Sequence, residues 1–145
     1  MCTAIATWTG ERVAFDVGVD GDSGLRHTVR LDDGAPFGDD TGMRPTEALL
    51  GALGACTGIN AVLLLQKHKQ RHRTLRVEVE ADQAETWPKA FTAIRVEFVL
   101  GWEPGFSPDP DLVARALDDA CLRYCPVHAT LAPGVPITHR YRSES

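Results

Sequence analysis

Residues 44–70 read RPTEALLGALGACTGINAVLLLQKHKQ and contain eighteen consecutive residues without a charge, from Ala48 to Leu65. Pro45 suits the first turn of a helix, because its fixed φ and missing N–H cost nothing there. Glu47 would then lie near the positive end of the helix dipole, where a carboxylate is favourable. The stretch therefore predicts a long helix that begins at Pro45.

This apolar helix has two interpretations. A run of about 18 or more apolar residues is long enough to cross a membrane, whereas a helix that is apolar all round can also be buried in a soluble core or a dimer. Gly51, Gly54 and Gly58 dilute the apolarity, and Asn60 does so too. We therefore favour a buried, central helix and expect no membrane association. Each glycine costs about 1 kcal/mol relative to alanine, which predicts that another segment approaches the helix closely.

The segments around this helix alternate apolar and polar residues with a period of two, as half-buried strands do. Residues 11–32 predict a β-hairpin, interrupted by a turn, and residues 3–8 predict a further strand. The alternation returns at residues 75–80 and 94–100. We expect two more strands there.

The last third of the chain predicts two shorter helices. Asp109 and Cys125 each precede a proline and are candidate N-caps, and residues 137–141 predict a final strand. The expected order is βββαββααβ, an α+β arrangement without the regular alternation of a doubly wound sheet. We expect residues 1–145 to form one domain.

The composition excludes several classes of function. A chain of 145 residues that is 43% hydrophobic fits one folded domain. Fifteen Lys and Arg against twenty Asp and Glu give a net charge of −5, which argues against nucleic acid or anionic lipid as partner. Residues 1–12 lack the pattern of a secretory signal, so we expect a cytoplasmic protein with reduced thiols. No glycine-rich phosphate motif adjoins a strand, and we expect no cofactor.

Two cysteines are candidates for chemistry. Cys56 lies about ten residues into the long helix, beyond the first turn where the dipole lowers a thiol pKa. It is therefore either a small buried hydrophobe or a thiol activated by another side chain. Cys125 is a candidate N-cap, where backbone N–H groups and the dipole favour a thiolate and predict a lowered pKa.

The other two cysteines predict no chemistry of their own. Cys121 lies on the apolar stripe of its helix and is expected in the core, and Cys2 is close to the terminus. A zinc site of Cys121, Cys125 and His128, with Cys56 as a fourth ligand, is an alternative. We do not favour it, because the spacing matches none of the usual zinc motifs.

The charges at the start of the long helix also leave two interpretations. Glu47 precedes Cys56 by nine residues, which puts the two on opposite faces of an ideal helix, about 13.5 Å apart along its axis. Glu47 is therefore a helix-start charge, or it meets a cysteine or arginine from a neighbouring element or subunit. Arg44 is the nearest cation in that loop, and its alternative is an exposed loop arginine.

Residues 44–70, together with RYCPVHATL at 123–131 and ITHRY at 137–141, resemble the OsmC/Ohr family, most closely its OsmC-like branch. The resemblance implies an intertwined α+β homodimer with two active sites at the subunit interface. In the peroxidase members of the family, the first cysteine attacks a hydroperoxide and the second resolves the sulfenic acid as a disulfide.

Carried over to this chain, the resemblance makes Cys56 the peroxidatic thiol and Cys125 the resolving thiol. Peroxidase members place a glutamate directly after the proline, where this chain has Thr46, and Glu47 follows one step later as in the OsmC-like branch. They also carry an active-site arginine in the N-terminal β region. Arg44 is our first choice for the basic partner of Cys56.

The resemblance implies a thiol peroxidase of oxidative-stress defence that reduces small organic hydroperoxides and is restored by an external dithiol. The alternatives are a non-catalytic small-ligand-binding or redox-sensing dimer, and a purely structural dimer. The dipole argument favours Cys125 as the nucleophile and the resemblance favours Cys56. We choose Cys56, because a helix dipole contributes only about 0.3–1 kcal/mol, less than a positioned cation in a desolvated pocket. Cys56 and Cys125 should lie within disulfide reach or one local rearrangement away.

Overall fold

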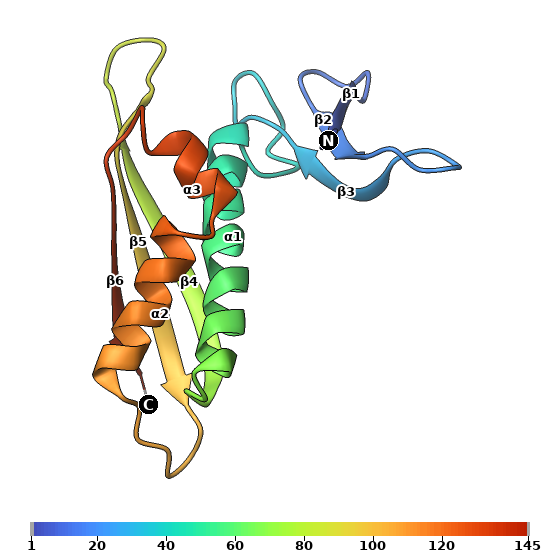
Figure 1. The fold of residues 1–145 in the computed structure, drawn as a ribbon. Coiled ribbons are helices and arrows are strands. Elements are labelled where there is room, and N and C mark those ends of the chain that lie inside the picture. Colours follow the sequence, from blue (N-terminus) through green and yellow to red (C-terminus); the bar gives the residue numbers. More distant parts are fainter. Residues whose placement is uncertain (1, 145) are drawn as a thin grey trace. The chain divides into compact units, whose positions relative to one another are not determined.

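The structure is a computed structural model that describes residues 2–144. Its elements follow the predicted order βββαββααβ and form an α+β fold (Figure 1). The strands are β1 (Ile5–Trp8), β2 (Phe15–Val19), β3 (Arg26–Leu31), β4 (His72–Gln83), β5 (Phe91–Trp102) and β6 (Ile137–Ser143), and the helices are α1 (Pro45–Lys67), α2 (Pro110–Leu122) and α3 (Pro126–Leu131). The chain divides into two compact units, one ending at Leu49 and the other beginning at Leu50.

The first unit contains an antiparallel sheet in the order β1-β2-β3. The predicted hairpin and the additional strand are both confirmed, although β2 begins at Phe15 because the chain turns at Arg12, whose φ is 47°. Asp32 fastens the loop that follows β3, accepting hydrogen bonds from the Thr41 hydroxyl at 2.7 Å and the Thr41 N–H at 3.0 Å. These bonds, led by the hydroxyl, lower the pKa of Asp32 to about 2.

The second unit contains a sheet in the order β4-β5-β6. Strands β4 and β5 form an antiparallel hairpin, with Val77 opposite Phe98. Strand β6 pairs parallel to β5 after a crossover through α2 and α3. The sequence predicted β6 as a strand, but its pairing partner and direction emerge only from the structure.

The core of the second unit lies between this sheet and the helices. Helix α1 approaches β4 closely at two glycines: a Cβ at Gly54 would lie 3.1 Å from the Val79 side chain, and one at Gly58 would lie 3.3 Å from Val77. The predicted close approach is therefore confirmed for these two positions. A Cβ at Gly51 would meet nothing within 4 Å. The fully buried members of this core include Leu53, Ala61, Leu65, Ile94, Val96, Phe98, Leu100, Val113, Ala116, Leu117, Ala120 and Cys121.

The opposite side of α1 remains open within one chain. Ile59 is 62% exposed and Leu63 is 59% exposed, and both line an apolar groove of about 530 Å³ with Val62 and Leu75. The sheet and the other helices cover only one side of α1, so the burial of the open side stays a prediction that depends on the expected dimer. By length and apolarity α1 alone among the described helices could cross a membrane, but its inner side packs into the core as a soluble helix does.

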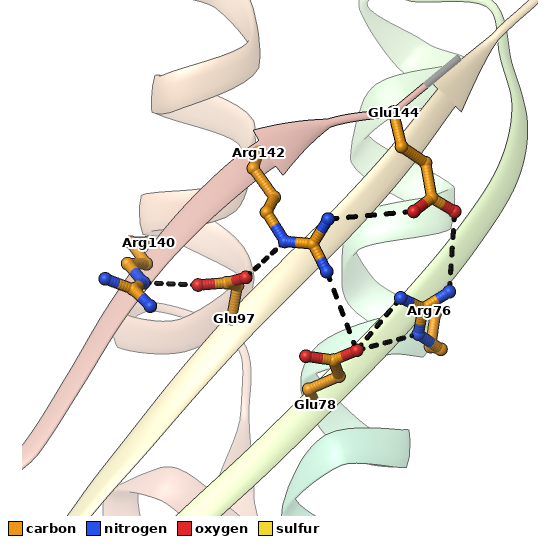
Figure 2. A network of polar contacts seen from close by, with 6 residues as sticks. All are labelled: Arg76, Glu78, Glu97, Arg140, Arg142 and Glu144. Atoms are coloured by element: carbon orange, nitrogen blue, oxygen red, sulfur yellow. Dashed lines mark hydrogen bonds and ion pairs between the residues drawn. The ribbon is translucent and has the colours of Figure 1, made fainter.

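The face of the sheet away from the core carries paired charges (Figure 2). Glu97 on β5 accepts hydrogen bonds from Arg140 and from Arg142, the latter at 2.5 Å. The Arg142 hydrogen bond, with that of Arg140, lowers the pKa of Glu97. On β4, Glu78 pairs with Arg76 at 2.9 Å. Such exposed pairs contribute little stability each, and the face is typical of a solvated sheet surface.

Candidate functional site

Cys56 lies in the middle of α1, on the side that faces the second unit's core. Its side chain is half-buried and packs against the buried cluster that contains Cys121 and Cys125. Leu53, one turn earlier on the helix, is fully buried. The long helix therefore holds one thiol at the edge of an apolar interior.

Cys125 lies in the short connection between α2 and α3. It is the N-cap of α3, with φ −91° and ψ 106°, and Pro126 occupies the first helical position. The Cys125 Sγ accepts a hydrogen bond from the backbone N–H of His128 at 3.2 Å. The predicted cap is confirmed, and the side chain is 97% buried, since only 3% remains exposed.

The structure brings the two thiols together. The pKa of Cys125 is raised, first by burial and then by a hydrogen bond with Cys56. The backbone N–H groups of His128 and Val127 act in the opposite direction but do not prevail. The cap thus acts in the predicted direction, but the predicted net lowering of the pKa is wrong, because burial destabilises the thiolate more than the cap stabilises it. The raised pKa favours the protonated form of Cys125.

The remaining cysteines lie where the sequence predicted. Cys121 is 1% exposed, and burial, with smaller contributions from Cys125 and Asp118, raises its pKa to about 12. Cys2 is exposed. Within residues 2–144, no group of three or more His, Cys, Asp or Glu side chains is arranged to hold a metal ion, so the zinc alternative gains no support.

His128 lies one turn after Cys125, and the sequence predicts a role for it only as a ligand in the zinc alternative. His128 is 7% exposed, and its Nε2 has no hydrogen-bond partner among the residues that the structure describes. Burial, and then the charge of His139, lower the pKa of His128. His139 on β6 pairs with Asp118 on α2, with Nε2 and Oδ1 2.7 Å apart. The only sequence signal for His128 was its place one turn after Cys125.

Glu47 and Arg44 form a pair at the start of α1. Glu47 Oε1 accepts a hydrogen bond from the Arg44 backbone N–H at 2.9 Å and lies 3.6 Å from the Arg44 guanidinium. Both Asp33 and Asp40 approach the same guanidinium at 3.7 Å. Glu47 is therefore a charge in the first turn of α1 that also pairs with an arginine of the preceding loop, so the contacts agree with both predicted interpretations. A role for Arg44 and Glu47 towards Cys56 stays a prediction.

The fold is α+β, and its candidate site pairs the half-buried thiol of Cys56 with the buried thiol of Cys125. Comparison with known sequences identifies the class of protein. The sequence model of the OsmC-like protein family matches residues 38–140, and the chain belongs to that family. Among curated relatives, it is 32% identical to Protein YhfA of Escherichia coli (strain K12) over 121 residues, which cover 83% of this chain and 86% of that protein.

Solved structures share the fold. The OsmC-like protein of Mycoplasma pneumoniae superposes with a TM-score of 0.80 at 18% identity, covering 99% of this chain and 96% of the other. The organic hydroperoxide resistance protein OhrB of Bacillus subtilis superposes with a TM-score of 0.60 at 18% identity, covering 97% and 98% of the two chains. Proteins that share this fold thus include one named for organic hydroperoxide resistance.

Proposed function

We propose that this protein is a thiol peroxidase that reduces small organic hydroperoxides, with Cys56 as the attacking thiol and Cys125 as the resolving thiol. The observation that carries the proposal is that Cys56 packs against the buried cluster that contains Cys125, whose pKa is raised by burial and by its neighbour Cys56. A thiol that is held protonated is a poor first nucleophile, since the thiolate is the reactive form. Its neighbour Cys56 is half-buried and within reach of a small apolar substrate.

The reaction balances as a two-electron reduction. The Cys56 thiolate attacks the terminal peroxide oxygen, the O–O bond breaks, and an alkoxide leaves to become the alcohol, with a sulfenic acid on Cys56. The Cys125 sulfur then attacks the Cys56 sulfur and displaces the sulfenic hydroxyl as water, which forms the disulfide. An external dithiol reduces that disulfide by two exchanges and is itself oxidised to a disulfide.

The surroundings support an apolar substrate. Cys56 packs against a cluster of mainly aliphatic side chains. Burial is the largest cause of the raised pKa of Cys125. Ionised substrates are costly to desolvate in such surroundings, whereas an alkyl hydroperoxide loses little. We propose that the protein works in the cytoplasm as a homodimer, with the apolar side of α1 at or near the interface.

A peroxide-consumption assay tests this function. Wild-type protein is mixed with cumene or tert-butyl hydroperoxide and excess dithiol, with several dithiols compared, and Cys56→Ser and Cys2→Ser are run in parallel. We expect catalytic turnover in wild type and Cys2→Ser and none in Cys56→Ser. Stoichiometric oxidation without turnover, with every dithiol tried, would instead favour a redox-sensing dimer of the same fold.

A further inference from the structure

The end of α2 leaves a buried carbonyl without its usual donor. In a regular helix the N–H of Tyr124 would bond to the carbonyl of Ala120. Here the Tyr124 N–H bonds instead to the carbonyl of Asp119 at 3.1 Å, and the Arg123 N–H bonds to the same oxygen at 3.0 Å. Ala120 is fully buried, and a buried carbonyl without a donor is costly.

Asn60 supplies a donor from the neighbouring helix. Its Nδ2 donates to the Ala120 carbonyl at 3.4 Å, a long hydrogen bond in a part-buried position. On α1, Asn60 follows Cys56 by four residues, which puts the two side chains on one side of the helix, one turn apart. On the other segment, Cys125 follows Ala120 by five residues. Two contacts one turn apart therefore join α1 to the same stretch of chain.

We propose that Asn60 is a positioning residue that holds the end of α2, and with it Cys125, opposite Cys56. Thr57, in the same uncharged run, bonds its hydroxyl inside α1, to the Leu53 carbonyl at 2.9 Å. The Asn60 bond instead crosses to α2. A leucine of similar size would favour the helix more than asparagine does. The Asn60 amide therefore contributes through its hydrogen bond to Ala120 and not through helix propensity.

The contact raises the effective concentration of one thiol at the other. In the reduced protein it holds the stretch 120–125 in place, so that less freedom is lost when the disulfide closes. A net hydrogen bond of this kind, at the weak end of the usual range, changes an equilibrium by about 2- to 5-fold. Asn60→Leu should lower the stability of the Cys56–Cys125 disulfide by that factor.

The test is a redox titration of the full-length protein without peroxide. Wild type, Asn60→Leu and the control Thr57→Val are equilibrated in dithiothreitol buffers, and the Cys56–Cys125 disulfide is quantified by alkylation and peptide mass. We expect Asn60→Leu to be easier to reduce by about 2- to 5-fold, roughly 10–20 mV. Thr57→Val, whose hydroxyl bonds stay within α1, should keep the wild-type potential.

The outcomes separate this inference from the proposed function, on whose thiol pair it rests. An unchanged potential in Asn60→Leu, or an equal shift in Thr57→Val, overturns the positioning role. Failure of the wild type to form the Cys56–Cys125 disulfide overturns it as well. If Asn60→Leu shifts the potential while the wild type turns over no hydroperoxide, the positioning role stands and the peroxidase proposal fails.

Discussion

Cys56 packs against the buried cluster that contains Cys125, and burial, together with this neighbouring thiol, raises the pKa of Cys125. The backbone cap at Cys125 forms as expected, with the His128 backbone nitrogen 3.2 Å from the sulfur. It lowers the pKa of Cys125, but by less than burial raises it. The cap therefore orients the thiol more than it ionises it. A thiol held in its protonated form fits the resolving role proposed for Cys125.

Substituting each thiol should separate their roles. After limiting hydroperoxide, Cys125→Ser should accumulate a sulfenic acid on Cys56 that dimedone traps, because the sulfur that displaces water is missing. Cys56→Ser should barely react, since Cys125 is buried and protonated. Mass spectrometry of the dimedone-labelled peptides measures the sulfenic acid on each cysteine in both variants.

Cys121→Ala is the matched control for these variants, because that thiol is also buried and its pKa is raised to about 12. It should form the Cys56–Cys125 disulfide like wild type. Sulfenic acid on Cys125 at the wild-type rate in Cys56→Ser would reverse the two roles. A Cys121–Cys125 bridge as the main wild-type product would refute the pairing.

The closure of the disulfide should depend on pH through Cys125. Burial, the largest contribution to its raised pKa, persists after Cys56 is oxidised. The attacking thiolate is therefore scarce at neutral pH, and the closure rate should rise about tenfold per pH unit between about pH 6 and 8. Acid quench after a single equivalent of peroxide, followed by mass analysis, measures that rate. A rate that stays flat over this range would contradict the assignment of Cys125.

Local sequence signals were sufficient for the elements that carry the site. A proline after Asp109 or Cys125 marks a helix start whatever the rest of the chain does, and both caps form. The glycines of α1 likewise predicted a close neighbour, because Gly54 and Gly58 gain nothing in an isolated helix. Such effects act within a few residues along the chain or on one face of a helix.

Contacts between distant segments could not be predicted in the same way. Whether the pKa of Cys125 is raised or lowered depends on how deeply the sulfur is buried and on Cys56, which lies 69 positions earlier in the sequence. Asn60 can donate to the Ala120 carbonyl because the N–H groups of Arg123 and Tyr124 both bond to the Asp119 carbonyl at the end of α2. The sequence around Asn60 gives no signal of how α2 ends.

The apolar side of α1 should hold two copies of the chain together. Ile59 is 62% exposed in one chain and lines the groove, so Ile59→Asp would place a charge in the interface at little cost to the monomer. We expect wild type to sediment as a dimer of 15.8 kDa chains, and Ile59→Asp to weaken association by about tenfold or more. Gln66→Asp, an exposed position of α1 outside the groove, should leave the dimer intact. A stable wild-type monomer in dilute solution would refute this interface.

The buried imidazole of His128 should make the protein less stable in mild acid. Burial and the nearby His139 lower the pKa of His128 below its usual value, so the unfolded chain binds the proton more readily than the folded one. The free energy of unfolding should therefore fall as the pH drops below about 6.5, until the lowered pKa is reached. His128→Leu removes this proton uptake and should flatten the profile, whereas His27→Leu, at an exposed position, should keep the wild-type slope. Urea unfolding from pH 7.5 to 5 measures the three profiles, and equal slopes in wild type and His128→Leu would show that His128 is not the group responsible.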